Sequence, residues 1–193
     1  MLNSAKNELN NRGGQMGIVS RICIAMTLTA LLGGCAATVK KSDDVKPLKV
    51  GANATRTIVL NMVGEKDATD SKDWEPFKGI WREALQEEAS AVGATVSAQE
   101  GGPKPTGTPG TLLAVDVVDF RYVSTGARVG LGIMTGNAFV NAQVSFRDLN
   151  TGEVWGERHY DTTSSAWQGV FAPMTDKQVH AICKEIVATL SNR

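Results

Sequence analysis

Cys35 is the residue of this 193-residue chain whose surroundings most clearly specify a chemical reaction. It follows Leu32-Gly33-Gly34 and an uncharged, mostly apolar run, Ile22 to Leu32, that begins directly after Arg21. This length suits the core of a signal peptide and is well short of the roughly 20 residues that cross a bilayer. The four residues ending in Cys35 resemble a lipobox, where a peptidase cuts before the cysteine and the thiol receives a diacylglyceryl group. The sequence therefore predicts lipidation at Cys35; the alternative is a buried helix that ends in Gly-Gly-Cys.

This prediction divides the chain into three parts. We expect a signal peptide over residues 1–34, the lipidated cysteine and a flexible tether over 35–55, and a globular domain over 56–193. A flexible tether of about 20 residues spans roughly 25 Å. Ala36 stands where Gram-negative lipoproteins retained at the inner membrane commonly carry aspartate, so the resemblance implies the outer membrane, with the domain facing the periplasm. Met16 begins a more typical signal sequence than Met1, which favours Met16 as the site of initiation.

A glycine-rich segment from Arg128 to Gly136 is the first candidate for contact with a partner. A phosphate-binding loop of this kind requires a helix after the glycines, to present its N–H groups. A strand is expected there instead, so we do not expect a nucleotide or another cofactor. Leu131 and Ile133 place apolar side chains among the glycines, which favours a partner-binding loop.

A second candidate segment, Ser164 to Met174, carries large apolar side chains outside any expected helix or strand: Trp167, Val170, Phe171 and Met174. They either fold back to cap the core or form an exposed anchor for a protein partner or a lipid surface. The two candidate segments flank one expected β-hairpin, so they could meet at one end of the sheet.

The remaining polar residues form no pattern typical of catalysis or metal binding. His159 and His180 have no nearby ligand at metal spacing. Asp116 and Asp119 are three residues apart on an expected strand and should point to opposite faces, which argues against shared acid–base work. We therefore expect no metal site and no enzymatic activity.

Hydrophobic periodicity predicts the secondary structure. A two-residue alternation is clearest over 137–148, and Asn150-Thr151-Gly152 then marks a hairpin turn. The expected strands are 56–63, 94–98, 112–120, 137–148 and 154–162, and the expected helices are 73–93 and 175–192. Two one-sided helices need a sheet to cover, which indicates an α+β fold: a largely antiparallel sheet of four to five strands with two amphipathic helices on one face.

Local signals also predict the helix ends and the state of the last cysteine. Asp73 is expected to cap the first helix and Gly93 to end it. Thr175 and Gln178 are spaced as a capping box for the second helix. Cys183 lies on the apolar face of that helix and is expected to be buried.

The charge balance argues against nucleic acid as a partner. The chain has 20 basic and 20 acidic residues, and three of the basic but one of the acidic residues precede Cys35. The expected mature protein is therefore faintly acidic and has no cluster of Lys and Arg to pair with a phosphate backbone.

One stretch begins with Tyr122-Val-Ser-Thr-Gly-Ala-Arg128, continues through the glycines to Gly136, and ends with Phe146-Arg-Asp148 and Thr151-Gly152. This stretch resembles a bacterial lipoprotein family, domain of unknown function 4410. The similarity covers about 56–190, and its specific part is 122–154. It implies a fold like the small α/β envelope domains of transport-auxiliary and curli-secretion-type proteins, and it implies no activity.

Together these patterns predict a lipid-anchored, non-enzymatic accessory protein of the cell envelope, held on the membrane by its N-terminal lipid, that binds other envelope components. The alternatives are a subunit of an oligomeric secretion or transport assembly and a carrier of a small molecule or lipid.

Overall fold

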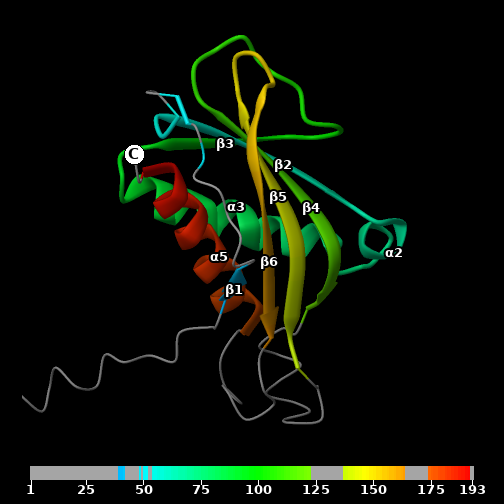
Figure 1. Ribbon diagram of the computed structural model, residues 1–193. Helices are drawn as coiled ribbons and strands as arrows, with labels where there is room; N and C mark the ends of the chain where they lie inside the picture. The colour runs from blue at the N-terminus through cyan, green and yellow to red at the C-terminus, as the bar shows by residue number, and fades with distance from the viewer. Residues whose placement is uncertain are drawn as a thin grey trace, which may run out of the picture. The chain divides into compact units, whose positions relative to one another are not determined.

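The computed structural model describes residues 39–41, 48, 50–51, 54–122, 137–163 and 174–191, all within one folded unit, residues 37–193 (Figure 1). Their helices and strands are, in order, β1 (Val39–Lys41), β2 (Thr57–Gly64), α2 (Lys66–Thr69), α3 (Trp74–Ser90), β3 (Thr95–Gln99), β4 (Thr111–Arg121), β5 (Phe139–Asp148), β6 (Val154–Thr163) and α5 (Met174–Ser191). Residues 1–36, which include the predicted signal peptide and Cys35, lie outside this description.

The strands form one open sheet in the order β1-β6-β5-β4-β2-β3. The pairs β1–β6, β6–β5 and β5–β4 are antiparallel, whereas β4–β2 and β2–β3 are parallel. The predicted α+β class and largely antiparallel sheet are confirmed. The sheet has one strand more than predicted because β1 lies in the range that the sequence assigns to the tether.

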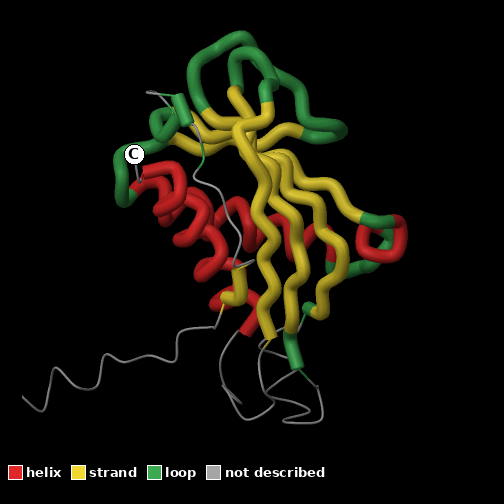
Figure 2. Tube along the Cα trace, viewed as in Figure 1, coloured by secondary structure: helices red, strands yellow, loops and turns green. Residues whose placement is uncertain are grey.

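Both long helices, α3 and α5, pack on the same face of the sheet, as predicted (Figure 2). Strand alternation sends one set of apolar side chains toward them, such as Ile58 and Leu60 of β2 and Val140 and Val144 of β5. Full burial of one such side chain contributes roughly 1.5–3 kcal/mol. The largest side chains that are fully buried in this layer include Phe77, Trp81, Phe146, Tyr160 and Ile182.

The described residues cover the opposite face, here called the open face, at one end. There Val59, Leu112 and Leu149 form a second small apolar cluster. The loop after β3 closes over this end, since Thr106 N donates to Leu149 O at 2.8 Å and Leu149 N donates to Gly110 O at 3.0 Å.

Helix termini follow the sequence signals only in part. Gly93 adopts a φ of 74°, and Ala94 N donates to Ala89 O at 3.0 Å, so α3 ends through a left-handed glycine as predicted. The predicted side-chain cap at Asp73 is wrong: its carboxylate makes no capping bond, and its own N–H donates to Ser71 Oγ at 3.2 Å. The reciprocal bond of the predicted capping box is also missing within the described residues, because Gln178 Oε1 has no partner there.

Part of the predicted tether belongs to the folded unit. Val39 pairs with Thr162 in the sheet. Leu48 and Val50 pack against the core, and Ala54 is buried, its carbonyl accepting a 2.6 Å bond from Thr111 Oγ1. The sequence predicted a coil here because the segment is polar; in the structure β1 pairs with β6 and becomes an edge strand of the sheet.

Candidate functional site

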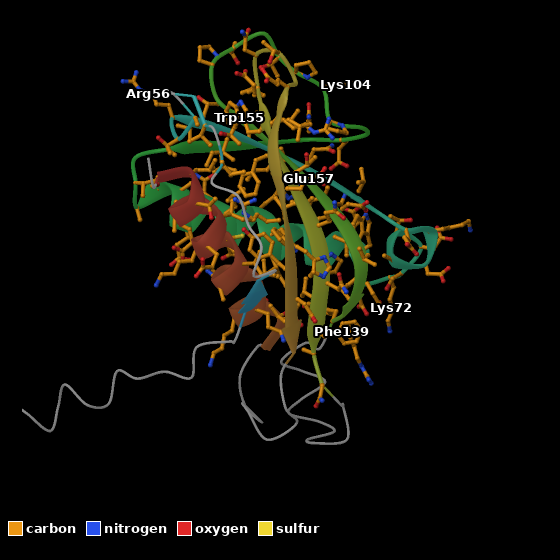
Figure 3. All side chains as sticks on the ribbon, viewed as in Figure 1. Arg56, Lys72, Lys104, Phe139, Trp155 and Glu157 are labelled. Carbon is orange, nitrogen blue, oxygen red and sulfur yellow. The ribbon has the colours of Figure 1, made fainter. Side chains whose placement is uncertain are left out.

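The candidate functional site is the end of the sheet where β4 stops, β5 starts, β6 stops and α5 starts. Arg121 of β4 lies opposite Phe139 of β5, and Phe139 lies opposite Thr163 of β6. We call this the loop end and define it by Arg121, Tyr122, Asn137, Phe139 and Thr163. Figure 3 shows Phe139 at this end and Trp155 near the other.

The predicted partner-binding residues belong to the two connections that leave the loop end. Leu131 and Ile133 lie in the connection from β4 to β5, and Trp167, Val170 and Phe171 lie in the connection from β6 to α5. All five lie outside the described residues. Met174 is the first residue of α5, but its side chain is not described. The structure does describe the residues at which these connections leave the strands. Those residues of β4, β5 and β6 lie opposite one another in the sheet.

An aromatic cluster under the end of β4 holds the loop end in place. The ring of Phe120 stacks on Phe77 of α3, with centroids 4.2 Å apart and planes 13° apart. Trp74 contacts both rings, at 6.1 Å from Phe120 and 6.3 Å from Phe77. Such aromatic pairs contribute about 0.5–1.5 kcal/mol beyond their buried area, so the last residues of β4 are fixed to α3.

Two buried side chains join the other elements at this end. Gln178 Nε2, in the first turns of α5, donates to Ala138 O at 3.0 Å. Thr162 Oγ1 of β6 accepts from Val140 N at 3.2 Å and donates to Val140 O at 3.3 Å. Because burial strengthens such bonds and penalises their loss, the starts of β5 and α5 and the end of β6 are held as one rigid edge.

The loop end also contains groups whose protonation is shifted by burial. Burial raises the pKa of the Tyr122 phenol, and the negative charges of Asp176 and Asp73 raise it further. Burial raises the pKa of Asp176 as well, while His180 opposes this effect and Glu83 adds to it. Tyr122 therefore stays neutral at physiological pH and can act as a hydrogen-bond donor.

The predicted separation of Asp116 and Asp119 onto opposite faces is wrong. Asp116 lies opposite Gln143 and Asp119 lies opposite Asn141, two residues that share the open face of β5. The register shifts between Val117 and Asp119, so the extra residue, Val118, forms a β-bulge and is 41% exposed. A strict two-residue period fails across such a bulge, and both carboxylates point to the open face.

The two histidines lie apart from each other. His159 is exposed on β6, opposite Gln143. His180 Nδ1 lies 3.8 Å from Glu87 Oε2 and links α5 to α3. In the part of the chain that the structure describes, no group of three or more His, Cys, Asp or Glu side chains is placed to hold a metal ion.

One buried charge was not anticipated from the sequence. Lys78 lies on the apolar stripe of α3, and its side chain is only 11% exposed. Its Nζ lies 2.9 Å from Glu75 Oε1 and 3.2 Å from Glu100 Oε2. The hydrogen bond to Glu75 raises the pKa of Lys78, and burial opposes that increase. The signal was present, since Lys78 stands four residues after Trp74 and three before Trp81, both buried, and residues at these spacings share a helix face.

Two hollows lie away from the loop end. One, of about 10 Å³, lies between α3 and the β2–β3 edge, beside Lys78, Arg82 and Glu100. The other, of about 160 Å³, lies beside the β5–β6 hairpin and is lined by residues that include Asp148 and Trp155. None of the helices among the described residues has the length and apolar content needed to cross a bilayer.

Comparison with known proteins adds remote structural likenesses. No protein-family model matches the chain, and no curated protein matches it in sequence. The PelC dodecamer from Paraburkholderia phytofirmans is similar over 81% of this chain and 99% of its own, with 15% identity and a TM-score of 0.49. Protein XCC0632 from Xanthomonas campestris, of family DUF330, is similar over 74% of this chain and 88% of its own, with 12% identity and a TM-score of 0.42. A candidate lipoprotein from Caulobacter crescentus is similar over 68% of this chain and 87% of its own, with 13% identity and a TM-score of 0.36. These likenesses assign no function, and the resemblance to domain of unknown function 4410 stays a prediction.

Proposed function

We propose that this chain is a lipid-anchored accessory protein of the bacterial cell envelope that acts by binding other envelope components rather than by catalysis. Cys35 in Leu32-Gly33-Gly34-Cys35 is the lipidation site, and the preceding apolar run is the export signal. Ala36 favours the outer membrane, where the domain would face the periplasm.

The observation that carries the binding role is the shared origin of the two apolar connections. Both leave the sheet at the loop end, where Arg121, Phe139 and Thr163 lie side by side in register. Interface cores favour Trp, Phe and Met, and a single partner surface reaches side chains that start from neighbouring strands. Trp167 and Phe171 are the residues that we expect to contribute most to the interface, together with Val170, Met174, Leu131 and Ile133.

Cross-linking in envelope extracts, followed by recovery of the tagged full chain, tests this role. We expect Trp167→Ala and Phe171→Ala to lose a partner that the unaltered protein recovers. Val154→Ala is the matched control, because Val154 is 46% exposed and starts β6 at the opposite end of the sheet. Unchanged recovery by both loop variants, or equal loss in the control, would contradict the assignment.

The anchor is tested separately by mass spectrometry of the N-terminal peptide. We expect a peptide that begins at Cys35 and carries fatty acyl chains such as palmitate, and a Cys35→Ser variant that fails to sediment with membranes. A mature protein without lipid would contradict the proposal at its first step.

A further inference from the structure

The pairing of β1 restricts how a lipidated protein can stand on a membrane. β1 runs antiparallel to β6, with Val39 opposite Thr162 and Lys41 opposite Tyr160. Since β6 ends at Thr163, β1 must begin at that same end, which is the loop end. Figure 1 shows β1 beside the end of β6 and the start of α5. The chain therefore enters the fold at the loop end and not at the hairpin.

We infer that the loop end faces the lipid bilayer and that the β5–β6 hairpin points away from it. The inference rests on the proposed lipidation of Cys35. Four residue steps separate Cys35 from Val39, and a fully extended chain covers at most about 3.3–3.6 Å per residue, or about 14 Å in all. The acylated cysteine thus holds the loop end close to the headgroups, much closer than a free tether of 20 residues would.

The hairpin is too far away to exchange places with the loop end. β5 and β6 each contain 10 residues. At about 3.3 Å per residue, this separates the two ends of the sheet by roughly 30 Å. This length is about twice the reach of the segment between Cys35 and Val39, so the hairpin cannot take the membrane position while β1 stays paired.

The charges favour an upright position over one in which the sheet lies flat on the membrane. Among the described side chains, the open face carries four acidic groups, Asp116, Asp119, Glu157 and Asp161, against two basic ones, Arg121 and Arg147. Anionic lipids repel such a surface. Proteins that bind the loop end must accordingly lie in the membrane or at its surface.

Fluorescence quenching by labelled lipids measures this orientation directly. A cysteine is placed at Asn137, beside the loop end, or at Asn150, in the hairpin turn; both asparagines are exposed. Cys183 is fully buried and Cys35 is acylated, so a bimane label reacts at the new cysteine. The lipidated proteins are reconstituted into vesicles of phosphatidylethanolamine and phosphatidylglycerol that contain a nitroxide-headgroup lipid.

We expect the label at Asn137→Cys to lose most of its fluorescence and the label at Asn150→Cys to lose little. Equal quenching at the two positions, or stronger quenching at Asn150→Cys, in protein that floats with the vesicles overturns the orientation and leaves the anchor intact. Protein that does not float and carries no lipid overturns the anchor and the orientation together.

A lengthened linker provides the matched control. Inserting about 20 Gly and Ser residues after Cys35 adds roughly 25 Å of reach without touching a described residue. Quenching at Asn137→Cys should then fall toward the value at Asn150→Cys. Quenching at Asn137→Cys that does not change with linker length would show that the short spacer does not set the orientation.

Discussion

The contact between Leu48 and Gly156 tests whether the chain after β1 is docked on β6. A Cβ atom at Gly156 would lie 2.5 Å from Leu48 Cδ2, far inside the contact distance of about 3.5–4.0 Å. Because Cδ2 is the end of a flexible side chain, Gly156→Ala should displace Leu48; the φ of 159° at Gly156, which residues with a side chain rarely adopt, adds backbone strain that does not depend on Leu48. Leu48 is half-buried, so the displacement forfeits only part of the roughly 1.5–3 kcal/mol of a fully buried leucine. We expect the displacement of Leu48 to lower the free energy of unfolding by about 1 kcal/mol, with the backbone strain lowering it further.

A double-mutant cycle separates this effect from damage to the strand. Urea unfolding, followed by tryptophan fluorescence, is measured for Gly156→Ala, Leu48→Ala and the double variant, all in a Cys35→Ser protein that starts at residue 35. The backbone strain at position 156 persists in the double variant, whereas the clash with Leu48 does not, so the double variant should lose less stability than the sum of the two single losses, with a coupling energy of about −1 kcal/mol. Additive losses would refute the reasoning, because the alanine would then disturb β6 whether or not Leu48 is present.

Three further predictions concern α3 and α5. Gly79→Ala should raise the free energy of unfolding by about 0.5–1 kcal/mol, since Gly79 is inside α3 with no atom near a new Cβ. Gly93→Ala should lower the free energy of unfolding by about 1 kcal/mol, because φ at Gly93 is 74°. Urea unfolding measures both. Burial raises the pKa of Asp176, so its ionised form lowers the stability of the folded state above that pKa. Asp176→Asn should therefore be most favourable near pH 7 and lose its advantage as the pH falls toward about 4; a pH series of unfolding curves checks the sign. Cys183 is fully buried and burial raises the pKa of its thiol, so a thiol reagent should modify it only after unfolding; labelling at the rate of a free thiol in the native protein would contradict the packing.

Elements specified by local signals were predictable from the sequence. The alternation in β5 and the turn at Asn150–Gly152 fix a hairpin within one short stretch, and Asp148 Oδ1 supports that turn by accepting from Asn150 N at 2.7 Å. The apolar stripe of α3 that faces the sheet is equally local, since residues three and four apart must share a face. These elements were enough to predict the fold class. They also led to the expectation that the two apolar connections begin at one end of the sheet.

Features that depend on distant partners were not predictable from the sequence. Val39 is a strand residue because Thr162, far along the chain, offers a free edge, and nothing in a polar segment signals that pairing. The bulge at Val118 depends on the register between β4 and β5, and it reverses the predicted relation of Asp116 and Asp119. At the candidate site, the apolar residues were identified from the sequence, whereas the register that brings the ends of β4, β5 and β6 side by side was visible only in the structure.

The packing between helices and sheet also bears on the alternative of a small-molecule or lipid carrier. Such a carrier needs space between the two layers, and pockets for drug-sized ligands usually enclose about 300–1,000 Å³. In the described part of the fold this interface is filled by Phe77, Trp81, Phe146 and Tyr160, each at most 1% exposed. The hollow at the edge of the layer, of about 10 Å³, lies beside Lys78, which is held by Glu75 and Glu100. A drug-sized ligand would have to displace packed aromatic rings, at a cost of several kcal/mol, or break the ion pairs of Lys78. The proposed binding through the loop end requires neither change.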